Sequence, residues 1–303
     1  MEKTLSWTIS NYIWVVLNHM LPTKVYLNLR YHQVFKKWID WNNPRSFTEK
    51  LQWMKVYGFR PEYVTMVDKL AVKQYVGGII GEEIIIPTLK VWEFAEEMDF
   101  SALPDSFVLK ANHDSGTVLV CKDKRKLNRQ QVVKYFKKAL SSDYYKIGRE
   151  TPYKYVSRRI FAEEFLDCGE DSEIKDYKFF CFNGEPKIFK INFDRSSNFT
   201  ANYYDLDMNV LPFGEVDPAP DYSKTCEKPE RFEYMVEICR KLSKGIPFVR
   251  VDLYNVNGNI YFGELTFFPT SGFGPFTSEE WDNRLGDWLV LPQTNNNNEY
   301  SGN

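Results

Sequence analysis

Residues 248–272 constrain the fold most, because they predict a β-hairpin that carries acidic side chains where a buried strand should have none. Two β-rich runs flank Asn257 and Gly258, and an Asn-Gly pair in that setting is the strongest short-range signal of a hairpin. Side chains alternate between the two faces of a strand, so each run presents a carboxylate on one face, Asp252 in the first and Glu264 in the second. The length of the turn decides whether these two faces coincide.

A two-residue loop over 257–258 sets Asp252 opposite Gly263, whereas a three-residue loop over 257–259 sets Asp252 opposite Glu264 on the same face. Like charges side by side on paired strands are destabilising unless a cation lies between them, and Mg²⁺ prefers carboxylate oxygens. We therefore predict the three-residue loop and a cation site. The alternative is a solvent-facing hairpin whose acids are simply hydrated.

Length and composition narrow the class of protein. A chain of 303 residues has room for two or three lobes with a sizeable core. It carries 39 basic and 41 acidic residues, and the net charge of −2 predicts no nucleic-acid partner. Five cysteines without a Cys-x-x-Cys pair predict reduced thiols in a cytoplasm, and three histidines without metal spacing predict no zinc site.

The first apolar run, residues 12–17, is too short to span a bilayer and is not followed by a cleavage site, so we expect no transmembrane segment and no export. Trp7, Tyr12, Trp14 and Leu17 form an alternative, an interfacial helix face. Such a face predicts peripheral contact with the inner side of the membrane.

Periodicity, caps and turn signals predict the remaining elements. Residues 1–45 are expected to be largely helical, and a capping box opens the next helix at Ser46. Further helices are predicted over 62–76, 128–141 and 229–243, strands over 84–87, 106–112, 118–121, 158–166, 176–182 and 186–193, and long loops over 88–104 and 194–229.

Three further groups suggest phosphate chemistry, each with a plainer alternative. Lys110 ends a strand just before the Gly/Ser loop 113–117, and such a loop can place backbone N–H groups on phosphates. Asp176 and Lys178 share one strand face, where opposite charges can also simply pair. Lys69 and Lys73 lie four residues apart, a spacing that is also common on a hydrated helix face.

The order of these groups resembles the ATP-grasp superfamily of ATP-dependent ligases. More closely, the chain resembles the TupA-like ATP-grasp family of surface-polysaccharide biosynthesis over about residues 40–290. The runs that carry this resemblance are NPRSFTEKLQW, VDKLAVKQYV, IIPTLKVW, FVLKANHDSG, DYKFFCFNGEPK and RVDLYNVNGNIYFGELTFFPTSG.

The resemblance implies an α+β fold in which two α+β lobes clamp ATP after a helical N-terminal region. The expected division is a helical region with a short strand over 1–104, a small lobe over 105–157, a large lobe over 158–292 and a disordered tail over 293–303.

The resemblance also implies roles for individual residues. Lys69 and Lys110 would contact phosphates or the adenine rim, His113, Ser115 and Gly116 would belong to a lid loop over the phosphates, and Glu163, Glu164 and Leu166 would hold the adenine edge. Asp176 would meet the ribose, while Lys178 and Arg250 would be the catalytic cations at the phosphates. Asp252, Glu264 and Thr266 would hold Mg²⁺. Thr266 stands where the superfamily commonly has Asn, and a hydroxyl is a weaker metal ligand than an amide oxygen, so the resemblance leaves open whether one or two Mg²⁺ bind.

The implied activity is an ATP-dependent carboxylate–amine ligase that forms an amide through an acyl phosphate. Its substrates would be ATP, a uronic acid of a capsule or O-antigen type polysaccharide or its precursor, and an amino acid or amine. A kinase or a glycosyltransferase is the alternative, the latter because residues 205–207 read Asp-Leu-Asp. The acids and cations named above disfavour a non-catalytic ATP-binding scaffold.

Overall fold

The computed structural model describes residues 21–169, 174–194 and 197–293. The interfacial face predicted at residues 7–17 lies outside these ranges, and so does the predicted tail apart from Gln293. Within the described ranges, the helices are all too short or too polar to cross a membrane.

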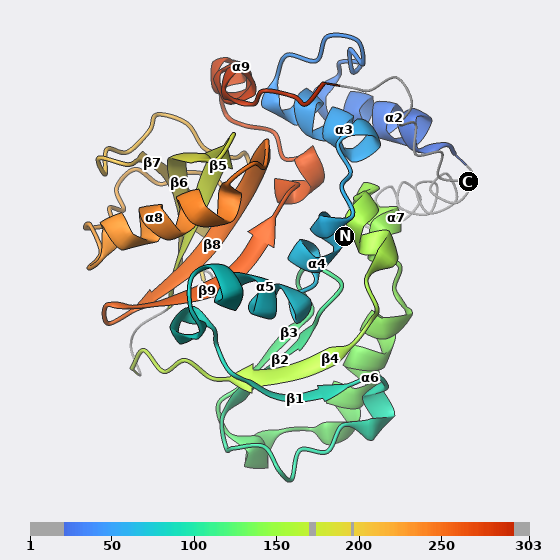
Figure 1. The fold of residues 1–303 in the computed structure, drawn as a ribbon, viewed down its shortest axis with the longest axis vertical. Helices are drawn as coiled ribbons and strands as arrows, with labels where there is room; N and C mark the ends of the chain where they lie inside the picture. Colours follow the sequence, from blue (N-terminus) through green and yellow to red (C-terminus); the bar gives the residue numbers. More distant parts are fainter. Residues whose placement is uncertain (1–20, 170–173, 195–196, 294–303) are drawn as a thin grey trace, which may run out of the picture.

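Two antiparallel sheets form the framework (Figure 1). The four-stranded sheet has the order β1-β4-β2-β3, and the five-stranded sheet has the order β7-β6-β5-β8-β9. The strands are β1 Thr88–Trp92, β2 Phe107–Ala111, β3 Val118–Cys121, β4 Ile160–Glu164, β5 Lys175–Phe182, β6 Glu185–Phe193, β7 Thr200–Asp205, β8 Phe248–Val256 and β9 Asn259–Thr266.

Helices cover the sheets and fill the space between them. The α-helices are α2 Thr23–Phe35, α3 Phe47–Tyr57, α4 Glu62–Val67, α5 Ala71–Ile79, α6 Arg129–Ser141, α7 Tyr144–Gly148, α8 Phe232–Ser243 and α9 Glu279–Trp288. Short 3-10 turns are η1 Glu82–Ile84, η2 Ala95–Glu97, η3 Lys124–Lys126, η4 Thr151–Tyr155 and η5 Pro269–Gly272. Helix α8 packs on one face of the five-stranded sheet, α6 packs on the four-stranded sheet, and α4 and α5 lie between the two sheets (Figure 1).

The division of the chain differs from the expected one in two places. Buried side chains of α3, α4 and α5 belong to the same hydrophobic core as the five-stranded sheet, so residues 47–84 complete that core. Strands β1 and β4 both belong to the four-stranded sheet, although the first lies in the expected loop 88–104 and the second in the expected large lobe. Both differences depend on which helices and strands pack together in three dimensions, and local sequence patterns do not predict that packing.

The hairpin β8–β9 places Asp252 opposite Glu264, as predicted, but by a different route. Val256 pairs with Asn259, so the loop has two residues, and both of them, Asn257 and Gly258, have positive φ. This is the backbone that a two-residue hairpin turn requires. The register then shifts between Asp252 and Leu253, where Gly263 is the extra residue of a β-bulge. The three-residue loop was therefore wrong, while the pairing of the carboxylates is confirmed.

Three other predicted elements differ. The helix predicted over 62–76 is two helices, α4 and α5, because the Asp68 carboxylate accepts hydrogen bonds from the N–H groups of Leu70 and Ala71 and breaks the helix there. The strand predicted over 84–87 is not formed, since η1 precedes it and β1 begins at Thr88. The long loop predicted over 194–229 contains β7, which pairs with β6.

The capping box at the start of α3 is confirmed. The Ser46 hydroxyl accepts a hydrogen bond from Glu49 N at 3.3 Å, and the Glu49 carboxylate accepts one from Ser46 N at 3.2 Å. We expect Ser46→Ala to lower the free energy of unfolding by about 1 kcal/mol, because an alanine cannot accept the bond from the helix N–H. Urea unfolding checks this, with Ser142→Ala at an exposed position after α6 as the control. Equal stability of the two variants would contradict the prediction.

Helix α9 joins the beginning of α3 across a long stretch of sequence. The Asp282 carboxylate accepts hydrogen bonds from Thr48 N at 3.0 Å and Thr48 Oγ1 at 2.6 Å. Lys50 Nζ donates to the carbonyl oxygens of Gly286 at 2.8 Å and Leu289 at 2.9 Å. A Cβ added at Gly286 would lie 2.1 Å from the carbonyl oxygen of Arg45, so the two helices approach too closely for any other residue there.

Candidate functional site

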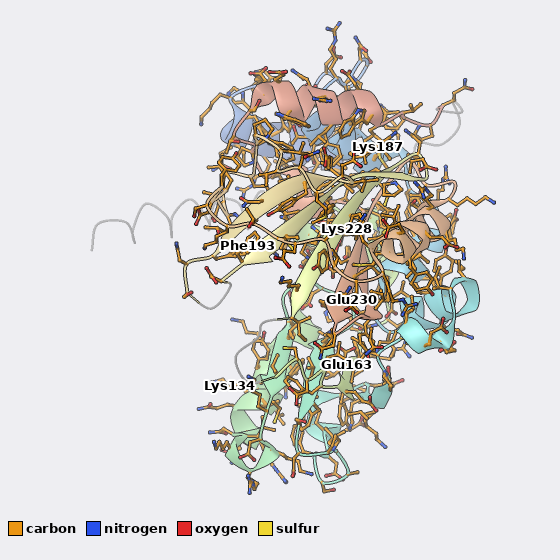
Figure 2. The ribbon with its side chains drawn as sticks, turned by 90° about the vertical axis from the view of Figure 1, so that its left-hand side faces the viewer. Lys134, Glu163, Lys187, Phe193, Lys228 and Glu230 are labelled. Carbon is orange, nitrogen blue, oxygen red and sulfur yellow. The ribbon has the colours of Figure 1, made fainter. Side chains whose placement is uncertain are left out.

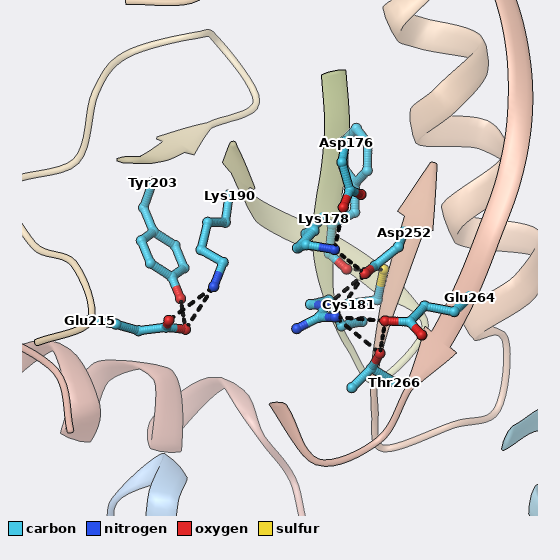
Figure 3. Close-up of polar contacts among 11 residues, drawn as sticks. Asp176, Lys178, Cys181, Lys190, Tyr203, Glu215, Asp252, Glu264 and Thr266 are labelled. Atoms are coloured by element: carbon cyan, nitrogen blue, oxygen red, sulfur yellow. Dashed lines mark hydrogen bonds and ion pairs between the residues drawn. The ribbon is translucent and has the colours of Figure 1, made fainter. Parts of the chain in front are cut away.

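Four charged side chains form a continuous row across the five-stranded sheet. Lys190 of β6 pairs with Lys178 of β5, Lys178 pairs with Asp252 of β8, and Asp252 pairs with Glu264 of β9. We call these four residues the charged row (Figure 3). The opposite face of the sheet is apolar and packs on α8, which explains why each strand alternates charged and hydrophobic side chains.

Asp252 is the centre of the charged row and is 1% exposed. Arg250 binds it with two nitrogens, Nε to Oδ1 and Nη2 to Oδ2, both at 2.7 Å. Lys178 Nζ lies 2.5 Å from Asp252 Oδ2 and 2.6 Å from Asp176 Oδ2. Burial alone would raise the pKa of Asp252, but the charges of Arg250 and Lys178 outweigh burial and lower it to about 2. Asp252 is therefore ionised at neutral pH.

Glu264 is the open end of the charged row, with a side chain that is 34% exposed, against 2% for the side chain of Asp252. One of its oxygens accepts a hydrogen bond from Arg250 Nη2 at 3.2 Å and one from Thr266 Oγ1 at 3.2 Å. Arg250 thus lies between the two carboxylates, as a cation must if they are to be neighbours.

The donor set of the charged row suits a hard divalent cation. Mg²⁺ is commonly bound by one or two carboxylates together with substrate phosphates, and Asp252 and Glu264 supply such a pair. In the described ranges no three His, Cys, Asp or Glu side chains come together as a metal-binding cluster. A cation here would therefore depend on oxygens from a bound phosphate.

The four-stranded sheet carries a second charged group around Glu163 of β4, which is 3% exposed (Figure 2). Its carboxylate forms ion pairs with Lys73 Nζ, at 2.9 Å, and with Lys110 of β2. Lys73 also donates to Ile86 O at 2.7 Å and to Thr88 Oγ1 at 3.1 Å. Two lysines on one buried carboxylate leave a net positive charge, which favours an anionic or electron-rich ligand.

Tyr254 connects the two groups. It pairs with Asp176 on the next strand, at the end of the charged face opposite Arg250. Burial raises the pKa of Tyr254 well above its usual value, and the negative charges of Asp176, Glu264, Glu163 and Asp252 raise it further. The pKa of Tyr254 thus responds both to the Glu163 carboxylate of the four-stranded sheet and to the carboxylates of the charged face.

The expected lid loop has one buried and one open part. Lys69 Nζ donates to the carbonyl oxygen of Asp114, and His113 Nε2 lies 3.1 Å from the Ala139 carbonyl oxygen of α6. His113 is 2% exposed, so its side chain faces the core of the four-stranded sheet and not the expected phosphates. Ser115 and Gly116 are exposed.

The rest of the loop and the expected adenine-binding segment are more open. Ser115 hydrogen-bonds to Tyr144 of α7, and Gly116 has φ +99° with open space around it. Glu164 is exposed and Leu166 is half-buried, next to Glu163 along the chain.

Sequence reasoning missed several buried polar groups. The spacing of Lys69 and Lys73 favours a hydrated helix face, yet Lys73 forms an ion pair with Glu163. Lys190 binds both oxygens of Glu215, at 2.9 and 3.0 Å, and Tyr203 donates to Glu215 at 2.9 Å (Figure 3). The one available signal for Lys190 was a lysine placed between the apolar residues Phe189 and Ile191 of β6. Lys55 of α3 is 1% exposed and was also missed.

Comparison with known proteins gives one strong match. A family described as TupA-like ATPgrasp matches residues 49–290. Among curated proteins, none matches the chain.

Several solved structures resemble the chain at low identity. D-alanine–D-alanine ligase from Bacillus anthracis complexed with ATP has a TM-score of 0.41 at 15% identity, covering 74% of this chain and 63% of that one. ATP-grasp ligase PsnB complexed with minimal precursor, Mg and ADP has a TM-score of 0.41 at 13% identity, covering 80% and 65%. D-alanine–D-alanine ligase from Helicobacter pylori has a TM-score of 0.39 at 13% identity, covering 81% and 71%. The chain covers less than two thirds of the first three such structures, 63%, 54% and 57% of their lengths.

Proposed function

The chain belongs to the TupA-like ATP-grasp family, and from this premise we propose that it is an ATP-dependent ligase that joins a carboxylate to an amine. Its α+β architecture, with two antiparallel sheets, is the ATP-grasp fold of that family. The observation that carries the proposal is the charged row with Arg250, because it gathers buried cations and a carboxylate pair on one sheet face.

We propose that ATP binds between the Glu163 group of the four-stranded sheet and the charged row of the five-stranded sheet. The adenine would lie at Glu163 and the following backbone to Leu166, near Lys73 and Lys110. The phosphates would then run along the charged face from Asp176 and Tyr254 at one end towards Arg250 at the other. Lys69 and the loop with Ser115 and Gly116 would cover the phosphates.

The cations supply the electrostatic part of the reaction. Lys178 and Arg250 would stabilise the charge that develops on the γ-phosphate, for which fixed charges in a buried site are well suited. Arg250 contacts both carboxylates, so it is held in place before any ligand arrives. Asp252 and Glu264 would hold Mg²⁺, which neutralises phosphate charge when bound, and Thr266 would assist through its hydroxyl.

The proposed chemistry has two steps. An oxygen of the substrate carboxylate attacks the γ-phosphorus in line, the bond to the bridging oxygen breaks, and ADP leaves, giving an acyl phosphate. The amine then attacks the acyl carbon, phosphate leaves, and the amine loses a proton to give an amide. The acyl phosphate is sensitive to water, which gives the loop 113–117 a reason to close over it.

For the substrates we propose a uronic acid of a surface polysaccharide or its precursor, joined to an amino acid or amine. This rests on the biosynthetic setting that the resemblance implies. We propose that the reaction takes place in the cytoplasm, where ATP is available. In an alternative form of this proposal, the acceptor substrates are presented at the inner face of the membrane.

The glycosyltransferase alternative loses support from the turn after β7. Asp205 accepts hydrogen bonds from Asp207 N at 3.0 Å, Asn209 N at 2.8 Å and Asn209 Nδ2 at 2.9 Å. Its carboxylate therefore stabilises its own turn, which is a sufficient reason for an aspartate there.

The test measures release of ADP and phosphate from ATP and Mg²⁺ with panels of uronic-acid sugars and amino acids. We expect release of both products only when an acid and an amine are present together, and a hydroxamate when hydroxylamine replaces the amine. ADP without phosphate, formed with a sugar alone, would support a kinase instead. Consumption of a nucleotide sugar that Asp207→Asn abolishes would favour the glycosyltransferase.

A further inference from the structure

Three successive residues after β9 have a left-handed backbone. Thr270 has φ 50° and ψ 30°, Ser271 has φ 52° and ψ 26°, and Gly272 has φ 61°. Glycine adopts this conformation freely, but Thr and Ser do so at a cost, and two of them in a row are unusual. Strained backbone persists only where the surroundings enforce it, and such positions concentrate at functional sites. We call residues 270–272 the left-handed turn.

Two buried side chains of α3 hold the left-handed turn by its carbonyl groups. Lys55 Nζ donates to Ser271 O at 2.7 Å and to Gln52 Oε1 at 2.9 Å. Gln52 Nε2 donates to Ser271 O at 3.2 Å and to Gly272 O at 2.8 Å. Both side chains are essentially inaccessible, 1% exposed for Lys55 and 0% for Gln52.

Glu150 binds the side chain of the left-handed turn, and its charge acts on Lys55. It accepts a hydrogen bond from the Ser271 hydroxyl and is 4% exposed. Burial lowers the pKa of Lys55 to about 7 and raises the pKa of Glu150, and each charge opposes the shift of the other. A buried lysine and a buried glutamate are costly singly, so their joint presence at one turn calls for an explanation.

The position of the turn supplies that explanation. Along the charged face, Asp176 pairs with Tyr254 at one end, and Arg250 pairs with Thr266 at the opposite end. The left-handed turn begins four residues after Thr266, beyond the Arg250 end. If ATP runs from Glu163 towards Arg250, the turn lies where the γ-phosphate and the acceptor meet.

Two tyrosines near Glu150 bear on the position of the left-handed turn. Tyr153 of η4 and Tyr144 of α7 are in edge-to-face contact, with ring centroids 4.7 Å apart. Burial raises the pKa of both phenols, and the charges of Glu150 and of Glu264 both contribute. The pKa values of both tyrosines therefore respond to Glu264, at the open end of the charged row, and to Glu150.

We propose that Lys55, Gln52 and Glu150 are positioning residues for the acceptor half of the reaction: they hold the left-handed turn against the Arg250 end of the charged row. This inference rests on the proposed ligase function. It gives Lys55 and Glu150 a role in the turnover of the acid and the amine and none in nucleotide binding. The reason is that Lys55, Gln52 and Glu150 all lie away from the Glu163 end of the charged face.

The test compares Lys55→Met, Glu150→Gln and the double variant with the wild type. Either single variant leaves a buried charge unpaired and should unfold more easily. The double variant removes both charges, so we expect a melting temperature close to that of the wild type and an ATP affinity within about 3-fold. Its kcat/KM for the acid and the amine should nevertheless fall by about 10-fold or more, because the hydrogen bond from Lys55 to Ser271 O is gone and Gln52 alone still donates to that carbonyl.

Lys50→Met is the matched control. Lys50 lies on the same helix and also donates to two backbone carbonyls, but those belong to Gly286 and Leu289. This variant should lose stability without a change in acceptor kinetics.

Each outcome decides between the two proposals. A double variant with wild-type acceptor kinetics would overturn the positioning role, and so would a parallel loss of ATP affinity. A wild-type protein that consumes no ATP with any acid and amine would instead overturn the ligase function and the positioning role with it.

Discussion

Replacing Asp252 with asparagine should lower ATP turnover by about 100-fold or more, the scale of losing one preorganised electrostatic group in an active site. The asparagine keeps the shape but leaves Arg250 and Lys178 as two buried cations without their shared partner. Breaking a buried ion pair from one side costs about 3–5 kcal/mol, so we expect the free energy of unfolding to fall by a similar amount. ADP release and urea unfolding measure the two effects.

Glu264→Gln should separate the loss of ATP turnover from the loss of stability, which Asp252→Asn is expected to cause together. Glu264 is partly exposed and receives one hydrogen bond from Arg250, so its loss should leave stability nearly unchanged while turnover falls as steeply. Asp207→Asn, in the turn after β7, should alter neither quantity. Turnover that survives in both the Asp252 and the Glu264 variants would show that the carboxylate pair does not act in catalysis.

Gly286→Ala should produce the largest loss of stability from a single methyl group, about 3 kcal/mol. Its Cβ would lie 2.1 Å from Arg45 O and 2.8 Å from Phe47 N, and both are backbone atoms that no rotamer change can move. Helix α9 would have to separate from the start of α3, with loss of the Thr48–Asp282 hydrogen bonds. Thermal or urea unfolding of the purified variant measures the effect.

Gly78→Ala is the matched control for this prediction. Gly78 lies inside α5, and a Cβ there would meet nothing within 4 Å. Alanine in a helix interior is favoured over glycine by roughly 0.5–1 kcal/mol, so this variant should gain stability. A Gly286→Ala protein as stable as the wild type would mean that α3 and α9 can separate freely.

The sequence predicted the carboxylate pair but not the geometry that produces it. Alternation and the Asn-Gly pair identified the hairpin, and the cost of adjacent acids identified the register. Both considered loops assumed a regular ladder, and the bulge at Gly263 satisfies the pairing with the shorter loop. Such a bulge depends on the neighbouring strand, here on the close approach of Asp252 O and the Tyr254 ring to Gly263. A local sequence pattern therefore does not predict it.

Buried lysines were the main failure of sequence reasoning about the site. Lys55, Lys73 and Lys190 look like ordinary surface residues, because a lysine is buried only when distant groups pair with it. Their partners lie far away in the chain, as Ser271 does for Lys55. Sequence alone also gave no indication that β1 and β4 pair with each other, because the two strands are far apart in the chain.

The contact between α3 and α9 also sets the order in which the protein can be completed during synthesis. Thr48 and Asp282 are separated by 234 positions, so α3 leaves the ribosome long before its partner exists. Until α9 has been synthesised, the apolar side of α3 stays partly exposed. The larger hydrophobic core is then still incomplete, although most strands of both sheets have already been synthesised. We therefore expect nascent chains that stop before α9 to bind chaperones and to be cut by proteases within α3, and chains that include α9 to resist both.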